Sequence, residues 1–448
     1  MSLLAILLSG AGLVAAGFPK RTGDRVERAF RASLAIALGV GAWSAAYAAW
    51  CLASGASGPT KDACLALAGA ALVVAFRKRE PEERKLRERA PRWLWATFAL
   101  ACAVAGAAFV EHTIRFPDGG WDAWMIWNLR ARFLVRAADF RTAFSPDLPF
   151  LAHQDYPWLL PGAVAQAFGQ LGESRVVPAA VAAVFGILTL AVVALAIARD
   201  LGARWGLLGG LAVATLPCFA TFASNQQSDV PLAAFLAIAA ALIASARSRR
   251  ELALAGFAAG LGIWTKNEGL LYALCLGVAF LWRTRDARGA LAFAAGALPC
   301  AALLVWFKLG VAPPNDLAAF STAESLAANA LDPRRWGELA LLTLRRVVYF
   351  QDFALWVLAQ ALLLWFFVRK QPASVLGTAL FLACAAYGPI YALQPHRLDW
   401  IFRTSADRIL IQIWPTAVLA TLAALAKAVA RPSRAPPRFS PVPGSPPA

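Results

Sequence analysis

The sequence has few charged residues and very few histidines and methionines. Asp, Glu, Lys and Arg make up 15% of its 448 residues, with three histidines and two methionines, whereas 60% of the residues are hydrophobic. Apolar stretches of membrane-spanning length recur along the chain, and one soluble core cannot bury so many of them. The composition therefore excludes a soluble domain and indicates an all-α polytopic membrane protein built as one helical bundle.

The seven cysteines also lack the spacing of a disulfide framework or a zinc site. They occur singly in apolar stretches, and no two form a Cys-x-x-Cys pair. They are interpreted as small buried hydrophobic residues.

Apolar runs predict about thirteen membrane spans, several of them short for a full crossing. They lie near residues 3–17, 32–52, 62–76, 93–110, 176–198, 205–222, 229–246, 252–264, 268–282, 289–308, 347–368, 373–393 and 409–428. The first run lacks a preceding basic region, so it is expected to be a retained helix and not a cleaved signal peptide.

The distribution of basic residues predicts which loops share a side. Alternate loops, those at 20–31, 77–92, 199–204, 247–250, 283–288, 369–370 and from 427 onward, hold 27 of the 43 Lys and Arg residues. These loops are expected to be cytoplasmic, because cytoplasmic loops carry an excess of Lys and Arg. The net charge of +17 is then explained by an inner face that binds anionic lipid, without nucleic acid.

The unusual polar strings all fall on the other, outer side. They are GGWDAWMIWNLRAR, HQDYP, SNQQSDVP, TKNEG and LDWIFRTSADR. Since ionisable residues are costly within a membrane protein unless they have a partner or a function, this convergence predicts an outward-facing polar site built from several loops.

The longest outer loop, residues 111–175, contains a predicted interfacial helix. Trp121, Trp124 and Trp127 recur every three residues, and Arg130, Arg132 and Arg136 follow. Trp and basic side chains with this spacing are typical of an amphipathic helix at the membrane surface. Asp118 and Asp122 are four residues apart, so they can share one face of that helix.

These strings resemble the polytopic GT-C glycosyltransferases, in particular the bacterial lipid-A aminoarabinose transferase and protein O-mannosyltransferase group. The resemblance covers about Trp93 to Arg408. It depends on four features, namely Asp122 with Ala131-Arg132-Phe133-Leu134 after it, Asp155-Tyr156-Pro157, the segment Asp229–Leu232, and the segment Gly260–Leu271.

The resemblance implies a fold, a reaction and partners. The fold is a GT-C-like transmembrane bundle with interfacial helices in the outer loops. N-terminal spans would occupy residues 1–92, the catalytic bundle 93–428, and a disordered proline-rich cytoplasmic tail 429–448. The protein would transfer a sugar from a polyprenyl-phosphate carrier to a hydroxyl of a glycan, lipid or protein acceptor at the outer face of the inner membrane. Asp122 would be the catalytic base, with Asp118 as the alternative.

The chemistry of such a transfer needs a carboxylate to remove the acceptor proton and cations to stabilise the departing phosphate. The expected substrate-binding residues supply both kinds of group, and they are His153, Asp155, Asp229, Lys266, Glu268, Arg132, Arg403 and Arg408. Relatives often carry Lys-Pro-Pro where this chain has Asp155-Tyr156-Pro157. Because that phosphate-binding lysine is missing, Arg403 or Arg408, assisted by Lys266, is expected to replace it, with Arg132 as the alternative.

Several alternatives stay open at the level of sequence. Asp122, His153 and Asp155 either hold a divalent metal ion, or His153 simply hydrogen-bonds Asp155. Asp229 either caps a helix or faces the sugar. Lys266 and Glu268 would otherwise form a solvated turn, and the whole protein would otherwise be a transporter or flippase of a lipid-linked glycan, although the predicted spans carry little internal charge.

Overall fold

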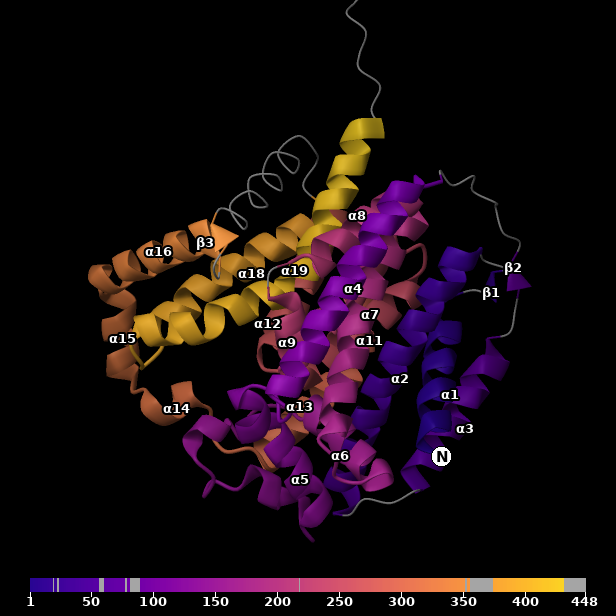
Figure 1. The fold of residues 1–448 in the computed structure, drawn as a ribbon. Coiled ribbons are helices and arrows are strands. Elements are labelled where there is room, and N and C mark those ends of the chain that lie inside the picture. Colours follow the sequence, from indigo (N-terminus) through magenta and orange to yellow (C-terminus); the bar gives the residue numbers. More distant parts are fainter. Residues whose placement is uncertain are drawn as a thin grey trace, which may run out of the picture.

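The computed structural model describes residues 1–18, 20–21, 24–55, 60–76, 79–80, 89–216, 218–350, 353–354 and 374–430. Its regular structure is almost entirely helical, as Figure 1 shows. The strands in the described part are two residues long: β1 (Lys20–Arg21) pairs with β2 (Arg79–Glu80), and β3 (Tyr349–Phe350) pairs with β4 (Phe353–Ala354). The expected all-α polytopic architecture is confirmed.

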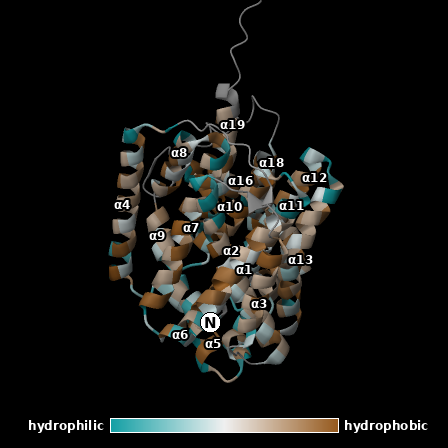
Figure 2. Cartoon of the chain, turned by 90° about the vertical axis from the view of Figure 1, so that its right-hand side faces the viewer, coloured by the Kyte–Doolittle hydropathy of each residue, from teal (hydrophilic) through white to brown (hydrophobic). Residues whose placement is uncertain are grey.

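Six helices in the described residues are long and apolar enough to span a membrane. They are α2 (Arg25–Ser54), α4 (Arg92–Arg115), α7 (Val176–Leu201), α13 (Ala287–Gly310), α18 (Val375–Ala392) and α19 (Leu398–Ala430), the last over Leu398–Ala426. Figure 2 shows α4 at the edge of the bundle, with hydrophobic residues along most of its length. Helices α1 (Ser2–Gly17) and α3 (Thr60–Ala75) pack beside α2. The chain is therefore a multi-pass membrane protein.

The buried centre of the bundle is α10 (Asp229–Ser245). Every residue from Asp229 to Ile243 is buried, because α10 packs against helices on several sides. Its main neighbours are α7, α11 (Arg249–Thr265) and α19, and α12 (Glu268–Thr284) follows α11 directly. A helix that is apolar all round needs such an environment.

The long outer loop folds over one end of the bundle as short elements. These are η1 (Ala123–Trp127), which is a π-helix, α5 (Asn128–Arg136), the 3-10 turns η2 (Phe140–Phe144) and η3 (Phe150–Ala152), and α6 (Leu159–Leu171). The expected interfacial tryptophan stripe is only partly correct. Trp121 and Trp124 are exposed, but Trp127 is buried because it packs into the core.

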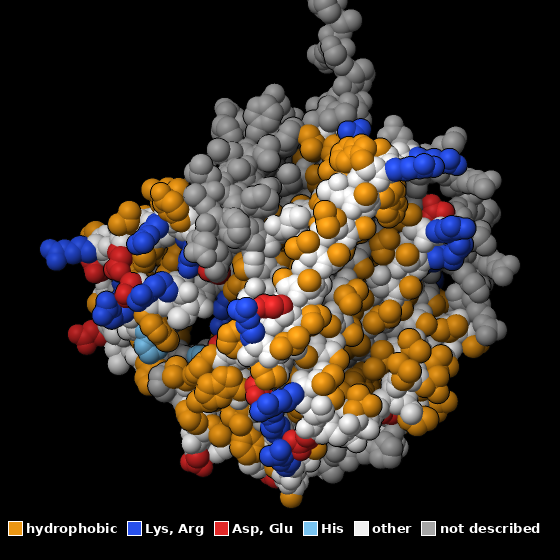
Figure 3. Space-filling view, viewed as in Figure 1, with side chains coloured by type: hydrophobic (Ala, Val, Ile, Leu, Met, Phe, Trp, Pro, Cys, Tyr) orange, Lys and Arg blue, Asp and Glu red, His pale blue; other side chains and the backbone are white. Residues whose placement is uncertain are grey.

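The C-terminal part forms an arm beside the bundle. Helix α16 (Pro333–Val348) packs against α18 and α19, α15 (Ala323–Leu331) contacts α18, and α14 (Asp316–Phe320) lies beyond α15 (Figure 1). Charged side chains gather on this arm, whereas the neighbouring bundle surface is mostly apolar (Figure 3). Arg335 ties α16 to the end of α18, since its guanidinium donates to the carbonyls of Ala392, Gln394 and His396.

Two of the predicted segments differ from the structure, and a third lies largely outside the described residues. The run at 205–222 is not one helix, because α8 (Ala203–Ala214) ends before α9 (Phe219–Ser224) begins, and Cys218 between them has φ +69°. The string 398–408 is not a loop, because α19 already starts at Leu398. The run at 347–368 falls largely outside the described residues, as does the tail from 431 onward, although α19 continues to Ala430.

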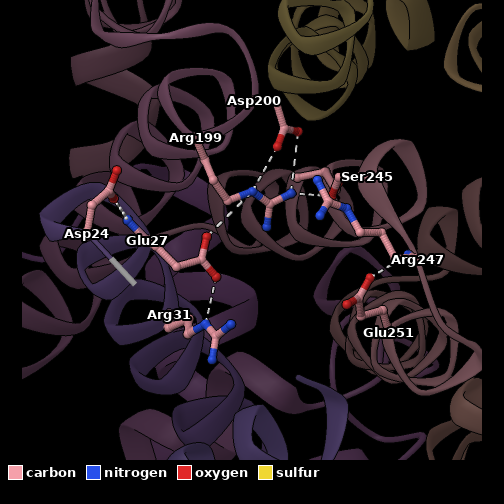
Figure 4. A network of polar contacts seen from close by, with 9 residues as sticks. Asp24, Glu27, Arg31, Arg199, Asp200, Ser245, Arg247 and Glu251 are labelled. Carbon is pink, nitrogen blue, oxygen red and sulfur yellow. Dashed lines mark hydrogen bonds and ion pairs between the residues drawn. The ribbon is translucent and has the colours of Figure 1, made fainter. Parts of the chain in front are cut away.

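Three of the loops expected to be cytoplasmic meet at the end of the bundle opposite the outer loop. Arg199 lies at their centre, where it pairs with Asp200 at 2.9 Å and with Glu27 at 3.9 Å and donates to Ser245 (Figure 4). Its guanidinium also lies 4.5 Å from the centroid of the Phe30 ring. The helix ends of α2, α7 and α10 are thus joined by one charged clasp.

Candidate functional site

Charged residues from four distant segments form one network at the outer-loop end. Lys266 Nζ lies 3.0 Å from Asp229 Oδ1 and 2.8 Å from Glu268 Oε1. Arg408 bridges two acids, with Nε 3.0 Å from Asp229 Oδ2 and Nη2 2.7 Å from Asp122 Oδ2. Four of the predicted outer strings therefore meet at one place.

Asp229 is the buried anchor of this network. Its side chain is 0% exposed, and Gln412 on α19 also donates to Oδ1 at 2.5 Å. It does not cap α10, because Ser228 precedes the helix and makes no side-chain cap bond. In the described residues Asp229 is the counter-ion of Lys266 and Arg408, whereas its expected contact with the sugar stays a prediction.

Local backbone structure places Lys266 and Glu268 beside Asp229. Lys266 ends α11 in an extended conformation, and α12 starts two residues later at Glu268. This abrupt change of direction needs Gly269, since a Cβ there would lie 2.0 Å from the carbonyl oxygen of Gly262. The buried Lys266 is consequently paired with the partly exposed Glu268, and the two residues do not form a solvated turn.

A second charged group lies around Asp155. Lys308 Nζ, from the end of α13, is 2.9 Å from Asp155 Oδ2, and it also donates to the Asp155 carbonyl. Asn267 donates to the same Oδ2 at 2.8 Å. The Lys308 side chain is 29% exposed, so an incoming anion can reach it.

Arg130 fixes the backbone of the HQDYP string. Although it follows the Trp stripe in sequence, it is 1% exposed and does not face the membrane surface. Its guanidinium donates to the carbonyls of Ala152, His153 and Tyr156. Burial lowers the pKa of Arg130 to about 10, while the nearby Asp155 opposes that shift, so the side chain stays charged at neutral pH.

Tyr156 joins the two charged groups through an aromatic stack. Its ring lies between Trp127 and His153, with centroid distances of 5.7 Å and 5.0 Å and nearly parallel planes. Lys266 Nζ lies 5.8 Å from the centroid of the same ring. Burial raises the pKa of Tyr156 well above its ordinary value, and the neighbouring acids add to that shift, so its hydroxyl stays protonated.

The SNQQSDVP string holds the loop that carries Asp122. Gln226, which is 2% exposed and has φ +56°, donates to the Pro117 carbonyl at 3.1 Å and accepts from Asn128 at 2.7 Å. Gly120 N–H donates to the Asn225 carbonyl at 3.0 Å. A single π-helical turn follows Asp122, and such turns are frequent at functional sites. These contacts fix the position of the Asp122 carboxylate.

Three predicted site residues, Asp118, Arg132 and Arg403, lie apart from both the network and the group around Asp155. Asp118 does not share a face with Asp122; it pairs with Arg175 at 3.2 Å and with Arg132 at 3.7 Å. Arg403 pairs with Asp399 at 3.2 Å on an exposed face of α19, with 70% of its side chain accessible. Arg408 joins the network instead, because residues 403 and 408 lie on different faces of α19.

The described residues give little support to a metal centre. No group of three or more His, Cys, Asp or Glu side chains in the described part of the chain is placed to hold an ion. Asp155 is paired with Lys308, Asp122 with Arg408, and the His153 ring stacks on Tyr156. Basic partners on two of the three expected ligands disfavour cation binding there.

Sequence reasoning missed several residues of the site, namely Lys308, Asn267, Gln412, Gln226 and Arg130. Lys308 had a usable signal, because it is a lone lysine at the end of an apolar run. Gln412 had a weaker one, as an amide within a span. The roles of Asn267, Gln226 and Arg130 depend on tertiary contacts that the sequence does not display.

The fold and the charged network together define the class of protein. It is a multi-pass membrane protein whose polar site lies at one end of its spans. Residues 156–307 match the family model described as dolichyl-phosphate-mannose-protein mannosyltransferase. This match covers about a third of the chain, and it supports an enzyme of the GT-C glycosyltransferase type with a lipid-phosphate-sugar donor. The matched region contains Asp229, Lys266 and Glu268, whereas Asp122 and Arg408 lie on either side of it. No curated protein and no solved structure matches the chain.

Proposed function

We propose that this protein transfers a sugar from a polyprenyl-phosphate carrier to an acceptor hydroxyl at the outer face of the inner membrane. The observation that carries the proposal is the network in which Arg408 joins Asp122 to the buried pair Asp229 and Lys266. It combines a partly exposed carboxylate with cations, which are the two kinds of group that this reaction needs.

Asp122 is the base in this mechanism. Its side chain is 16% exposed and lies at the rim of the network, in contrast to the fully buried Asp229. It removes the proton from the acceptor hydroxyl, whose oxygen then forms a bond to the anomeric carbon. The bond from that carbon to the phosphate oxygen breaks, and the carrier phosphate leaves with the electron pair. A single displacement of this kind inverts the anomeric centre.

The donor phosphate takes its place at Arg408 by displacing Asp122. The network holds three acids, Asp122, Asp229 and Glu268, against two cations, Lys266 and Arg408, so an added anion must replace a carboxylate. The Asp122 pair is the accessible one, and Arg408 Nη2 makes no hydrogen bond of normal geometry to a described residue. Phosphate binding at Nη2 thereby frees Asp122 for its role as base.

Lys308 is a second phosphate partner. It contacts Asp155, which stands where relatives carry their usual lysine, and its side chain is partly exposed. The guanidinium of Arg408 holds the phosphate by directed hydrogen bonds, whereas Lys308 adds a mobile point charge. Arg132, which faces Asp118, is not needed for this contact.

The outer-face assignment follows from charge. In the described part of the chain, three of the loops rich in Lys and Arg meet at the end that holds the Arg199 clasp, and the network lies at the other end. Under the positive-inside rule the network then faces away from the cytoplasm.

The test is binding of polyprenyl phosphate to purified protein in lipid nanodiscs. Arg408→Lys, which keeps a charge but cannot bridge two acids, is expected to weaken binding by about 1.5–3 kcal/mol, or roughly 10- to 150-fold. Asp122→Asn is expected to bind at least as tightly as wild type, since a competitor for Arg408 has lost its charge. Arg403→Ala is the matched control and should bind normally.

Two results would contradict the proposal. One is an equal loss of affinity in Asp122→Asn and Arg408→Lys, because Asp122 would then be part of the phosphate site. The other is a loss confined to Arg403→Ala, which would move the phosphate to the exposed face of α19.

A further inference from the structure

Three of the six tyrosines of the chain meet beside the network. Tyr272 lies one turn after Glu268 on α12, and Tyr387 and Tyr391 lie one turn apart on α18. The ring centroids of Tyr272 and Tyr387 are 6.0 Å apart, and those of Tyr387 and Tyr391 are 6.2 Å apart. We call these three residues the tyrosine wall.

The tyrosine wall is attached to the helix that carries Arg408. The Tyr391 hydroxyl and Ser405 Oγ are 2.7 Å apart, and Ser405 precedes Arg408 by three residues. The Tyr391 ring also contacts Phe402, with centroids 5.3 Å apart. Glu268 is near enough to act electrostatically on all three phenols. The wall therefore borders the place where Lys266 and Arg408 would receive the phosphate.

Several buried polar atoms at this border are unsatisfied. The Tyr272 and Tyr387 hydroxyls lie near enough to interact with each other, and neither makes a hydrogen bond of normal geometry with any other described residue. The same holds for Glu268 Oε2 and Gln412 Oε1 within the described part of the chain. Tyr272 and Tyr387 are 5% and 9% exposed, so bulk water does not solvate them. Buried polar atoms in folded proteins are nearly always paired, so a cluster of unpaired ones indicates a polar ligand.

We propose that the tyrosine wall and Glu268 form the subsite for the sugar ring of the donor. A sugar presents hydroxyl groups that both donate and accept hydrogen bonds, and it has apolar C–H faces. Phenols match both features, since each has a hydroxyl and an apolar ring, and the free oxygen of Glu268 adds an acceptor. Apolar neighbours such as Leu232 and Phe402 pack among the tyrosines, which suits an uncharged sugar.

The position of Glu268 assigns the wall to the donor and not to the acceptor. One oxygen of Glu268 is held by Lys266, which shares Asp229 with Arg408, and the other oxygen is free. A group bound there is adjacent to the phosphate cations, as a sugar linked to that phosphate must be. This inference depends on the proposed function, because it assumes a lipid-phosphate-sugar donor.

The experiment compares two probes, polyprenyl phosphate and polyprenyl-phosphate mannose, bound to the same proteins in nanodiscs. The double variant Tyr272→Phe/Tyr387→Phe keeps both rings and removes two hydroxyls. It is expected to lose about 10-fold in affinity for the sugar-bearing lipid and to bind the bare phosphate like wild type. Tyr349→Phe, at a position 57% exposed, is the control and should change neither affinity.

A second variant, Glu268→Gln, tests the proposal independently if the double variant does not fold. It keeps the shape of the side chain and should also weaken binding of the sugar-bearing lipid more than binding of the bare phosphate. Equal losses for both probes, unchanged affinities for both, or a change seen only in the Michaelis constant for the acceptor would each overturn the sugar subsite. If wild type bound neither lipid, the proposed function itself would fail, which is a different result.

Discussion

At the scale of single residues, the main feature of the site is the number of partners around one carboxylate. Asp229 is fully buried and contacts Lys266, Arg408 and Gln412. Taking such an ion out of water is costly, and its partners offset the cost only while all of them are in place. The exposed pair of Asp399 and Arg403 on the same helix as Arg408 has the opposite character, because solvent screens it.

The contrast between these two acids gives a matched prediction. Asp229→Asn leaves two buried cations with too little negative charge and should destabilise the protein by about 3–5 kcal/mol. Asp399→Asn should change stability by about 1 kcal/mol at most. Thermal unfolding in a single detergent measures both, with wild type alongside. Indistinguishable unfolding temperatures for the two variants would show that the buried network contributes no more than a surface pair.

Much of the candidate site could be predicted from the sequence, because its residues fall on one side of the predicted spans. Asp122, Asp155, Asp229, Lys266 and Arg408 fall in strings on one side of the predicted spans, and that side was readable from the basic residues. The sequence did not predict which residues of these strings contact one another. Arg403 and Arg408 were equivalent candidates, because the helical turn from 398 that separates them was expected to be a loop.

At the scale of elements, the site depends on how one loop is docked on another. Residues 117–120 lie against residues 225–227, and Gly119, at the point of contact, has φ +79°. A Cβ on Gly119 would be 2.6 Å from the Asn225 carbonyl oxygen and 2.7 Å from the Ala123 Cβ. Neither the contact nor the conformation was readable from the Gly-Gly pair alone, because glycine pairs occur in many turns.

Gly119→Ala should therefore move the Asp122 loop and reduce sugar transfer by roughly 100-fold, a loss that a misplacement of about 1 Å can cause. Gly172→Ala is the control. Gly172 has φ +82°, so it carries the same left-handed strain, but a Cβ there meets nothing within 4 Å. Its transfer rate should stay near that of wild type. Equal losses in both variants would attribute the effect to backbone strain and not to the docking of the loop.

At the scale of the whole molecule, the two ends of the bundle differ in charge and in contacts. One end carries the clasp of Arg199, Glu27 and Asp200 (Figure 4), built from loops expected to be cytoplasmic. The other end carries the network and the outer loop. Alternate loops lie on the same side because successive spans cross the membrane in opposite directions. The fold was predictable to this extent because apolar length and basic residues are local signals. The end of α8 before α9 and the early start of α19 have no such local signal.

Absolute orientation is tested by labelling single cysteines. Ser145→Cys, in the outer loop, should react with a membrane-impermeant thiol reagent once the outer membrane is opened. Arg288→Cys, at the opposite end, should react only after the inner membrane is breached. Wild type is the background control, because Cys64 and Cys384 are exposed side chains. The reverse labelling pattern would place the site in the cytoplasm.

The most direct test of the account is sugar transfer itself. Purified protein in vesicles would be given polyprenyl-phosphate mannose and a cell-envelope extract as acceptor, and release of the sugar from its carrier would be measured. Wild type and Asp118→Asn should transfer at similar rates, because Asp118 lies on a separate pair with Arg175. Asp122→Asn cannot accept the proton, so its transfer rate should fall by about 100-fold or more, while it still binds the carrier. Transfer at the wild-type rate by Asp122→Asn, with a loss in Asp118→Asn, would contradict the account.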